Sequence, residues 1–198
     1  MTDHPHTDEA ALWTRLATLL PSPEEAAEVQ ACWDIGEQEG GLTLLVQRIG
    51  EQRVPVDDLT RAEIALLAHE WGVWDQLGTP VAAFTPGTGR PERLRVLVDG
   101  AEEPVPVRSV LPDHPSPELL LVPWITCAGR GSTLARGHVR EPWGDLSYLP
   151  LCYVTFSTGA DVAPQVFAHE RPGAVWSAFG ALRSGVTPVR QDSPSTDR

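Results

Sequence analysis

Apolar residues in the first 80 positions recur every three or four residues, the spacing of one helix face. The first stripe starts near Glu9 and ends at Pro21, where a proline cannot continue a helix. Ser22-Pro23-Glu24-Glu25 has the composition of a helix start, and the stripe that follows runs to Ile49, with a weak point at Gly40-Gly41. The pattern therefore predicts two helices, the second of them long and kinked.

A further helix is predicted from Thr60-Arg61-Ala62-Glu63, which has the spacing of a capping box, to Gly72, a suitable terminator. We therefore expect three or four short antiparallel helices in residues 1–84. The segment Phe84–Pro91 is dense in Gly and Pro and is interpreted as a linker. The last residues, 185–198, are expected to form a disordered tail.

The hydrophobic period changes to two after the linker, which is typical of strands. Leu94–Val98 alternates, Asp99-Gly100 predicts a hairpin turn, and a returning strand is expected from Val105. Leu119–Cys127 reads as a buried strand, and residues 132–139 and 146–157 as further strands, with a helix over Gly173–Arg183. The fold class is thus α+β: N-terminal antiparallel helices, residues 1–84, followed by a mostly antiparallel sheet with one or two helices, residues 92–184. The pattern leaves open whether the two regions share a core.

Charge separates the two regions further. Residues 1–84 hold fifteen Asp and Glu against four Arg, whereas residues 85–198 hold twelve against eleven, so nearly all of the net charge of −12 lies in the first region. Such an excess disfavours nucleic acid as a partner, because phosphate binding needs basic side chains. It favours a basic protein partner, a cation, or solubility alone.

The composition suggests where the protein works. Every basic residue is Arg, and Ala, Gly and Pro are abundant, a usage typical of GC-rich actinobacterial genes. Three cysteines without paired spacing argue against a disulfide framework, and neither a signal peptide nor a long apolar run is evident. A cytoplasmic protein away from membranes is expected.

No complete catalytic, metal or cofactor motif is present, so we expect no cofactor and no metal, and we favour a protein without enzymatic activity. Cys127 followed by His138 has the outline of a zinc knuckle, but Arg130 stands where a second Cys is needed. Cys–His pairs such as Cys32 with His69 lack a local signature, and we favour a buried, inert thiol as their explanation.

Acidic residues beside tryptophans suggest a partner-binding surface in the helical region. Its candidate residues, which combine carboxylates with an aromatic anchor in the manner of protein-protein hot spots, are Asp34, Glu37, Gln38, Glu39, Glu70 and Trp74. The alternative is an ordinary solvated helix surface, or two carboxylates acting as acid and base, for which Glu37 and Glu70 are candidates.

A polar and aromatic loop between two predicted strands offers a second candidate site, either for a small ligand or for an enzyme reaction. Its residues are His138, Glu141, Trp143, Asp145 and Tyr148. Loops on rigid scaffolds often carry function. The alternative is a structural turn held in place by the packing of Trp143.

The stretch from Cys32-Trp33-Asp34-Ile35-Gly36-Glu37 through Arg61 to Glu70-Trp71-Gly72 resembles helical modules of actinobacterial proteins, some of them similar to immunity proteins of bacterial toxin systems. The resemblance covers residues 24–74. It implies a protein that neutralises a basic toxin by covering its active site. We therefore expect a binding protein of the inhibitor type whose acidic helical surface docks a basic partner.

Overall fold

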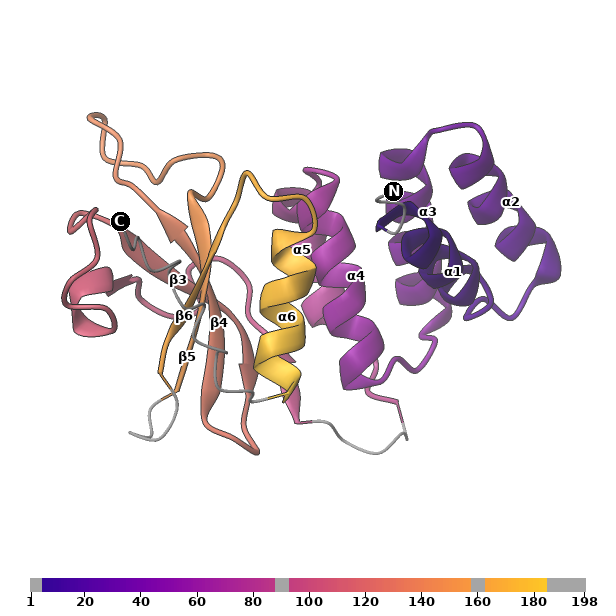
Figure 1. Cartoon of the computed structure of the whole chain (residues 1–198). Coiled ribbons are helices and arrows are strands. Elements are labelled where there is room, and N and C mark those ends of the chain that lie inside the picture. Colours follow the sequence, from indigo (N-terminus) through magenta and orange to yellow (C-terminus); the bar gives the residue numbers. More distant parts are fainter. Residues whose placement is uncertain (1–4, 88–92, 158–162, 185–198) are drawn as a thin grey trace, which may run out of the picture.

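The computed structural model describes residues 5–87, 93–157 and 163–184. Within these residues the fold is α+β and has three layers: the antiparallel sheet, then helices α4, α5 and α6, then helices α1, α2 and α3 (Figure 1). The helices are α1 (Pro5–Ala17), α2 (Pro23–Asp34), α3 (Gln38–Gln52), α4 (Asp58–Glu70), α5 (Trp74–Ala82) and α6 (Ala174–Ser184). The strands are β1 (Leu94–Val96), β2 (Val105–Pro106), β3 (Leu120–Cys127), β4 (Ser132–His138), β5 (Cys152–Ser157) and β6 (Gln165–Ala168).

The second predicted helix is two helices. Helix α2 begins as expected, because Pro23 occupies its first turn and the Ser22 hydroxyl accepts a hydrogen bond from the Glu25 amide. It ends at Asp34, and Gly36, two residues later, has a φ of 84°, a left-handed conformation that glycine adopts without strain. The chain leaves the helix before Gly40-Gly41, where we predicted a weak point, and α3 runs through both glycines. Gly41 instead lets α3 approach its neighbours, since a Cβ there would lie 2.7 Å from Cys32 Cβ and 2.8 Å from the Trp13 ring.

The start of α4 also differs from the prediction. Asp57, rather than Thr60, caps the helix, because its carboxylate accepts a hydrogen bond of 2.7 Å from the Thr60 amide while Thr60 itself is buried. Helix α5, which our sequence interpretation lacked, follows directly after Gly72. It brings Trp74 and Asp75 toward the sheet.

The sheet runs in the order β1-β3-β4-β5-β6, with β2 also paired to β3. Strands β1 and β2 do not pair with each other, so the predicted hairpin at Asp99-Gly100 is wrong. Both lie antiparallel to β3, β1 beside Ile125–Cys127 and β2 beside Leu120–Leu121. The residues between them, 97–104, form an excursion that interrupts one edge strand. Strand β5 covers only Cys152–Ser157 of the predicted range 146–157, whereas α6 lies where the sequence placed it.

The two regions share one hydrophobic core. A single cluster of buried side chains extends from Trp13 and Leu16 in α1, through Ile64 and Leu67 in α4, to Trp124 in β3. A second, smaller cluster lies on the other face of the sheet, where Val107, Leu119 and Leu121 pack together. The helices therefore pack against the sheet as one body and are not merely tethered to it.

The beginning of the predicted linker belongs to the helical region. Phe84 is buried, the Val56 amide donates to the Thr85 carbonyl, and the Gly87 amide donates to the Val56 carbonyl. The rest of that linker and the predicted tail, 185–198, lie outside the described residues. Among the helices of the described part of the chain, none has both the length and the apolar character to cross a bilayer.

Candidate functional site

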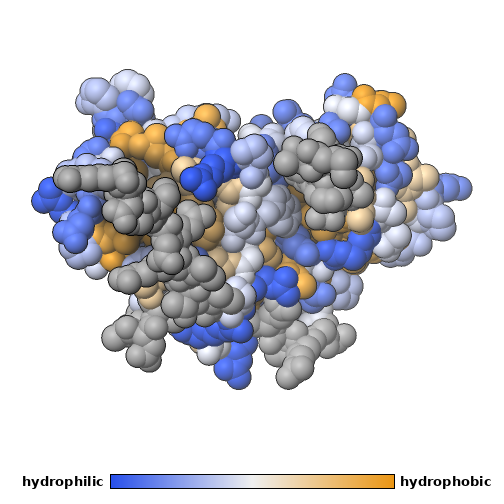
Figure 2. All heavy atoms as spheres, viewed as in Figure 1, coloured by the Kyte–Doolittle hydropathy of each residue, from blue (hydrophilic) through white to orange (hydrophobic). Residues whose placement is uncertain are grey.

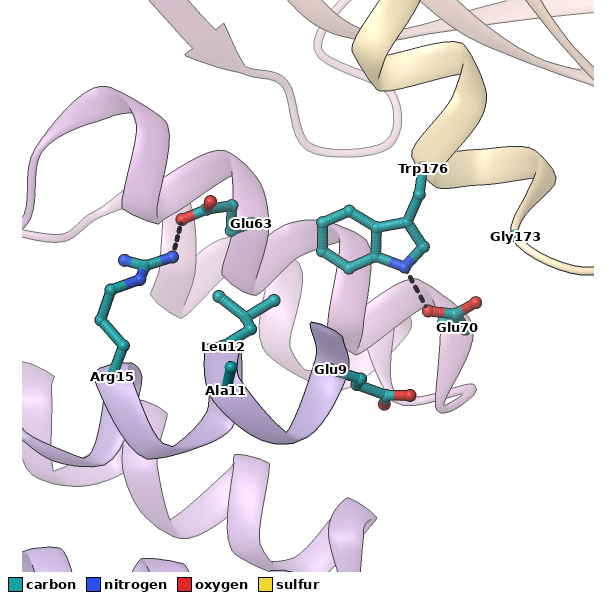
Figure 3. A pocket seen from close by; sticks show the side chains of 8 residues that line it. All are labelled: Glu9, Ala11, Leu12, Arg15, Glu63, Glu70, Gly173 and Trp176. Atoms are coloured by element: carbon teal, nitrogen blue, oxygen red, sulfur yellow. Dashed lines mark hydrogen bonds and ion pairs between the residues drawn. The ribbon is translucent and has the colours of Figure 1, made fainter. Parts of the chain in front are cut away.

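A groove opens where α1, α4 and α6 meet (Figure 3). Its volume is about 560 Å³, and Leu12, Ala11 and the half-buried ring of Trp176 give it an apolar lining. Figure 3 shows the Trp176 ring reaching from α6 toward Leu12 on α1. Glu9, Glu63, Glu70 and Arg15 also line the groove. It therefore combines an apolar surface with an excess of negative charge.

Hydrogen bonds hold each groove carboxylate. Glu70 accepts a bond of 2.6 Å from Trp176 Nε1, and Glu9 accepts one of 2.8 Å from Trp71 Nε1. Glu63 accepts a bond of 2.6 Å from the Arg15 guanidinium, the cation on this rim. The indole donors carry no net charge, so neither bond pairs Glu9 or Glu70 with a cation.

The environment of Glu70 disfavours the ionised form of its carboxyl group. Burial raises the pKa of its carboxyl, and the negative charge of Glu9 adds to that rise, while the bond from Trp176 opposes it. A cation placed in the groove would stabilise the ionised form of Glu70.

The predicted partner-binding residues fall into two places. Glu70 lines the groove, whereas Asp34, Glu37, Gln38 and Glu39 lie at the turn between α2 and α3 and are absent from its lining. Asp34, Glu37 and Glu39 are exposed there beside Ile35, whose side chain is 74% exposed. The acidic turn thus carries an exposed apolar residue of its own.

Trp74 is not a surface anchor, which corrects the prediction. It is only 3% exposed and packs edge-on against Trp124, with ring centroids 5.7 Å apart. Helix α5 turns its inner face toward the sheet, so the indole contributes to the core. Trp33, the other predicted neighbour, is half-buried and packs on Trp13.

The ion pairs of the helical region come from its own arginines. Arg15 pairs with Glu63, and Arg48 pairs with Glu25 and Glu51. Between described side chains, no ion pair joins an arginine beyond residue 85 to a carboxylate before it. Figure 2 shows hydrophilic residues over much of both the sheet side and the outer helical layer, with smaller apolar patches on each.

Two residues of the predicted ligand site, His138 and Tyr148, line a second hollow, here called the cleft, of about 340 Å³. The other three, Glu141, Trp143 and Asp145, do not line it. Trp143 is 73% exposed, so its packing does not hold the loop, contrary to our alternative. The turn is held instead by main-chain bonds between Glu141 and Asp145 and by the Arg140 guanidinium, which donates to the Gly144 carbonyl.

The cleft contains residues that the sequence interpretation missed: Arg136 at its floor, and Asp75, Asp99 and Glu102 around it. Arg136 follows Leu134 by two positions on β4 and points to the helix-covered face. A charged residue at an inward strand position was the available signal, because such residues are rarely buried without a partner. Asp99 and Trp74 come from distant segments, and nothing in their local pattern indicates that they meet.

A buried polar chain lies next to Arg136. The Tyr153 hydroxyl lies 3.0 Å from His69 Nε2 and 3.1 Å from His169 Nδ1. Burial, reinforced by the nearby Arg136 charge, lowers the pKa of His69 to about 3, and burial raises the pKa of Tyr153 to about 12. Both side chains are therefore neutral at pH 7.

The cysteine and metal candidates gain no support from the geometry. In the strand pairing, Cys127 lies opposite Ser132 and His138 opposite Leu120, so Cys127 and His138 occupy opposite ends of the β3-β4 pair. Burial raises the pKa of Cys152 to about 11, which disfavours the thiolate. Over the described ranges, no three His, Cys, Asp or Glu side chains gather as metal ligands would.

Comparison with known protein families, curated proteins and solved structures finds no match to this chain.

Proposed function

We propose that this protein is a non-enzymatic binding protein, of the inhibitor or immunity type, whose acidic helical region docks a basic protein partner. The observation that carries the proposal is the groove between α1, α4 and α6, where Glu9 and Glu70 lie beside an apolar surface without a neutralising cation among the described side chains.

The groove has the chemistry that a basic side chain on an apolar segment requires. An arginine or lysine head group of the partner would lie between Glu9 and Glu70, and its stem would pack on Leu12 and the Trp176 ring. Because burial already disfavours the ionised form of Glu70, an incoming cation gains more here than at a fully hydrated carboxylate.

The acidic turn between α2 and α3 would add long-range attraction. Asp34, Glu37 and Glu39 are exposed around Ile35, so this turn offers charge with one apolar contact. Complementary charge of this kind speeds association and makes it sensitive to salt. The expected partner is therefore a basic protein whose binding weakens as ionic strength rises.

The test is capture of basic proteins from the native host, followed by titration of the purified partner against three forms of the protein. These are the wild type, a groove variant carrying Glu9→Gln and Glu70→Gln, and a matched control carrying Glu103→Gln and Glu118→Gln in the sheet region. Both variants lose two negative charges, and the control residues are exposed and lie outside the groove.

We expect the groove variant to bind at least about tenfold more weakly and the control to bind within about twofold of the wild type. Raising the salt from about 0.05 M to about 0.5 M should weaken the wild type most. Recovery of no basic partner, or equal losses in the two variants, would contradict the proposal.

A further inference from the structure

The cleft is a second concave site, separate from the acidic groove. It lies between the excursion 97–104, the end of β4 and the loop after it. Asp75 reaches it from α5, Asp99 and Glu102 from the excursion, His138 from β4, and Tyr148 from the loop. Val122 and Leu146 add apolar surface. Four chain segments that are distant in sequence thus converge on one hollow of about 340 Å³.

Arg136 gives the cleft a positive floor. The residue is only 4% exposed, and its guanidinium carbon lies 5.1 Å from the Trp124 ring centroid and 6.0 Å from that of Trp74. One guanidinium nitrogen, Nη2, donates to Asp99, while Nε is buried without a partner in the described structure. A guanidinium has five N–H donors, and among the described residues only Nη2 has a hydrogen-bond partner. The terminal nitrogens therefore keep donors for an acceptor that enters the cleft, while the buried Nε lies out of a ligand's reach.

The remaining carboxylates give the cleft a negative mouth. Asp99 is balanced by Arg136, whereas no ion pair neutralises Asp75 or Glu102 among the described side chains. Both residues are exposed, so their charge faces solvent at the opening. The cleft therefore has the positively charged guanidinium of Arg136 inside and the two carboxylates of Asp75 and Glu102 at its opening.

His138 adds a neutral acceptor. Its Nδ1 lies 2.7 Å from the Ser147 carbonyl, which only accepts, so Nδ1 carries the proton and Nε2 keeps its lone pair. Burial lowers the pKa of this imidazole, which keeps that tautomer neutral at pH 7.

From this arrangement we infer that the cleft binds a small zwitterion of the α-amino-acid class, with its carboxylate on Arg136 and its ammonium group near Asp75 and Glu102. The apolar side chain of the ligand packs against Val122, Leu146 and the Tyr148 ring. This inference does not depend on the proposed protein partner.

Simpler ions fit the cleft less well. A phosphate or dicarboxylate would reach Arg136 but would meet the charges of Asp75 and Glu102. A plain amine would be attracted by those carboxylates but would leave the donors of Arg136 unsatisfied inside the cleft, which costs free energy. Only a ligand with both charges satisfies the floor and the mouth together.

Three matched probes test the inference by calorimetry on the full-length protein: L-leucine, its decarboxylated analogue 3-methylbutylamine, and its deaminated analogue 4-methylpentanoate. We expect L-leucine to bind, and each analogue to bind at least about tenfold more weakly because one charged contact is lost. Absence of L-leucine binding up to about 10 mM, or equal binding of the amine, would overturn the inference.

Substitutions of the two mouth residues give a sharper test, because Asp75 and Glu102 are exposed and changing them leaves the fold intact. Glu102→Gln and Asp75→Asn should each weaken L-leucine binding several-fold and at the same time strengthen 4-methylpentanoate binding, because a repulsive charge is removed. Glu103→Gln, a change of the same charge at the next position and outside the cleft lining, should alter neither. Parallel weakening of both probes in the mouth variants would contradict the assigned placement.

Discussion

The acidic groove and the cleft show two ways in which one fold arranges the same types of charge. In the groove, carboxylates of α1 and α4 are held by the neutral indoles of Trp71 and Trp176, so their negative charge stays available. In the cleft, a buried arginine takes one carboxylate as its partner and leaves the others at the mouth. The groove therefore suits a cation, and the cleft suits a ligand with two charges. Both sites hold more acidic than basic residues, so net charge does not distinguish them. What differs is that the cleft has a buried arginine, Arg136, among its carboxylates.

The largest effect is expected from a substitution in the core that the helical and sheet regions share. Trp124, fully buried between the sheet and α4, packs on His69 and Trp74. Trp124→Ala should lower the free energy of unfolding by about 3–5 kcal/mol, because it leaves a large cavity at the junction. Chemical denaturation followed by far-ultraviolet circular dichroism and by tryptophan fluorescence measures this change. Two separate transitions in the wild type would show that the regions fold independently and would contradict the shared core.

The next effect compares an ion pair from each region. Asp99→Ala leaves the buried Arg136 without its partner and should cost about 2 kcal/mol of stability, a value reduced from the fully buried case because Asp99 is 50% exposed. Glu63→Ala removes the pair with Arg15, whose side chain is 47% exposed, and should cost about 0.5 kcal/mol. Urea denaturation of both variants measures the difference. Equal costs would mean that Arg136 finds another partner or more water than the geometry indicates.

The smallest effect concerns pH. His69 has a pKa of about 3 when folded and about 6.5 when unfolded, so between these values the unfolded state binds more protons and stability falls as pH falls. We expect a loss of roughly 1 kcal/mol per pH unit below pH 6.5. Denaturation at pH 6.5 and pH 5, above the range of ordinary carboxyl titration, measures this loss.

His69→Gln is the control for that slope, since glutamine keeps a hydrogen-bonding group near the Tyr153 hydroxyl and does not titrate. The variant should lose less stability than the wild type over the same interval, although His138, whose pKa burial also lowers, continues to contribute. An unchanged slope would mean that the folded protein protonates His69 as readily as water-exposed histidine.

Local pattern predicted most of the secondary structure for identifiable reasons. The stripe through Leu12 and Leu16 indicated α1, the Ser22-Pro23 start indicated α2, and the apolar run ending at Cys127 indicated β3. The α+β class, which follows from the change of period near residue 90, is confirmed. The errors lie where contacts with residues distant in sequence decide the local structure. Gly41 looked like a helix breaker but is small because Trp13 and Cys32 lie against it.

Of the candidate sites, the sequence indicated parts and the structure supplied the relations between them. Three residues that we had chosen for their side-chain chemistry do line a hollow: Glu70 the groove, and His138 and Tyr148 the cleft. Trp74, chosen in the same way, is part of the core. Arg136 stands at an inward position of β4, which was a signal, but its partner Asp99 comes from a distant segment that no local pattern connects to it. The Asp99-Gly100 turn was read as a hairpin because the two-residue pattern is the same whether the chain returns beside itself or continues along β3.

By itself, then, the sequence determined the change from helices to strands near residue 90 and the excess of negative charge in the first 84 residues, because both follow from the identity and spacing of near neighbours. Only the tertiary structure decided which carboxylates keep their charge available and which are neutralised. That outcome depends on which side chains from distant segments exclude water from a group or donate a hydrogen bond to it. Trp176 at Glu70 and Asp99 at Arg136 are the two contacts that show it.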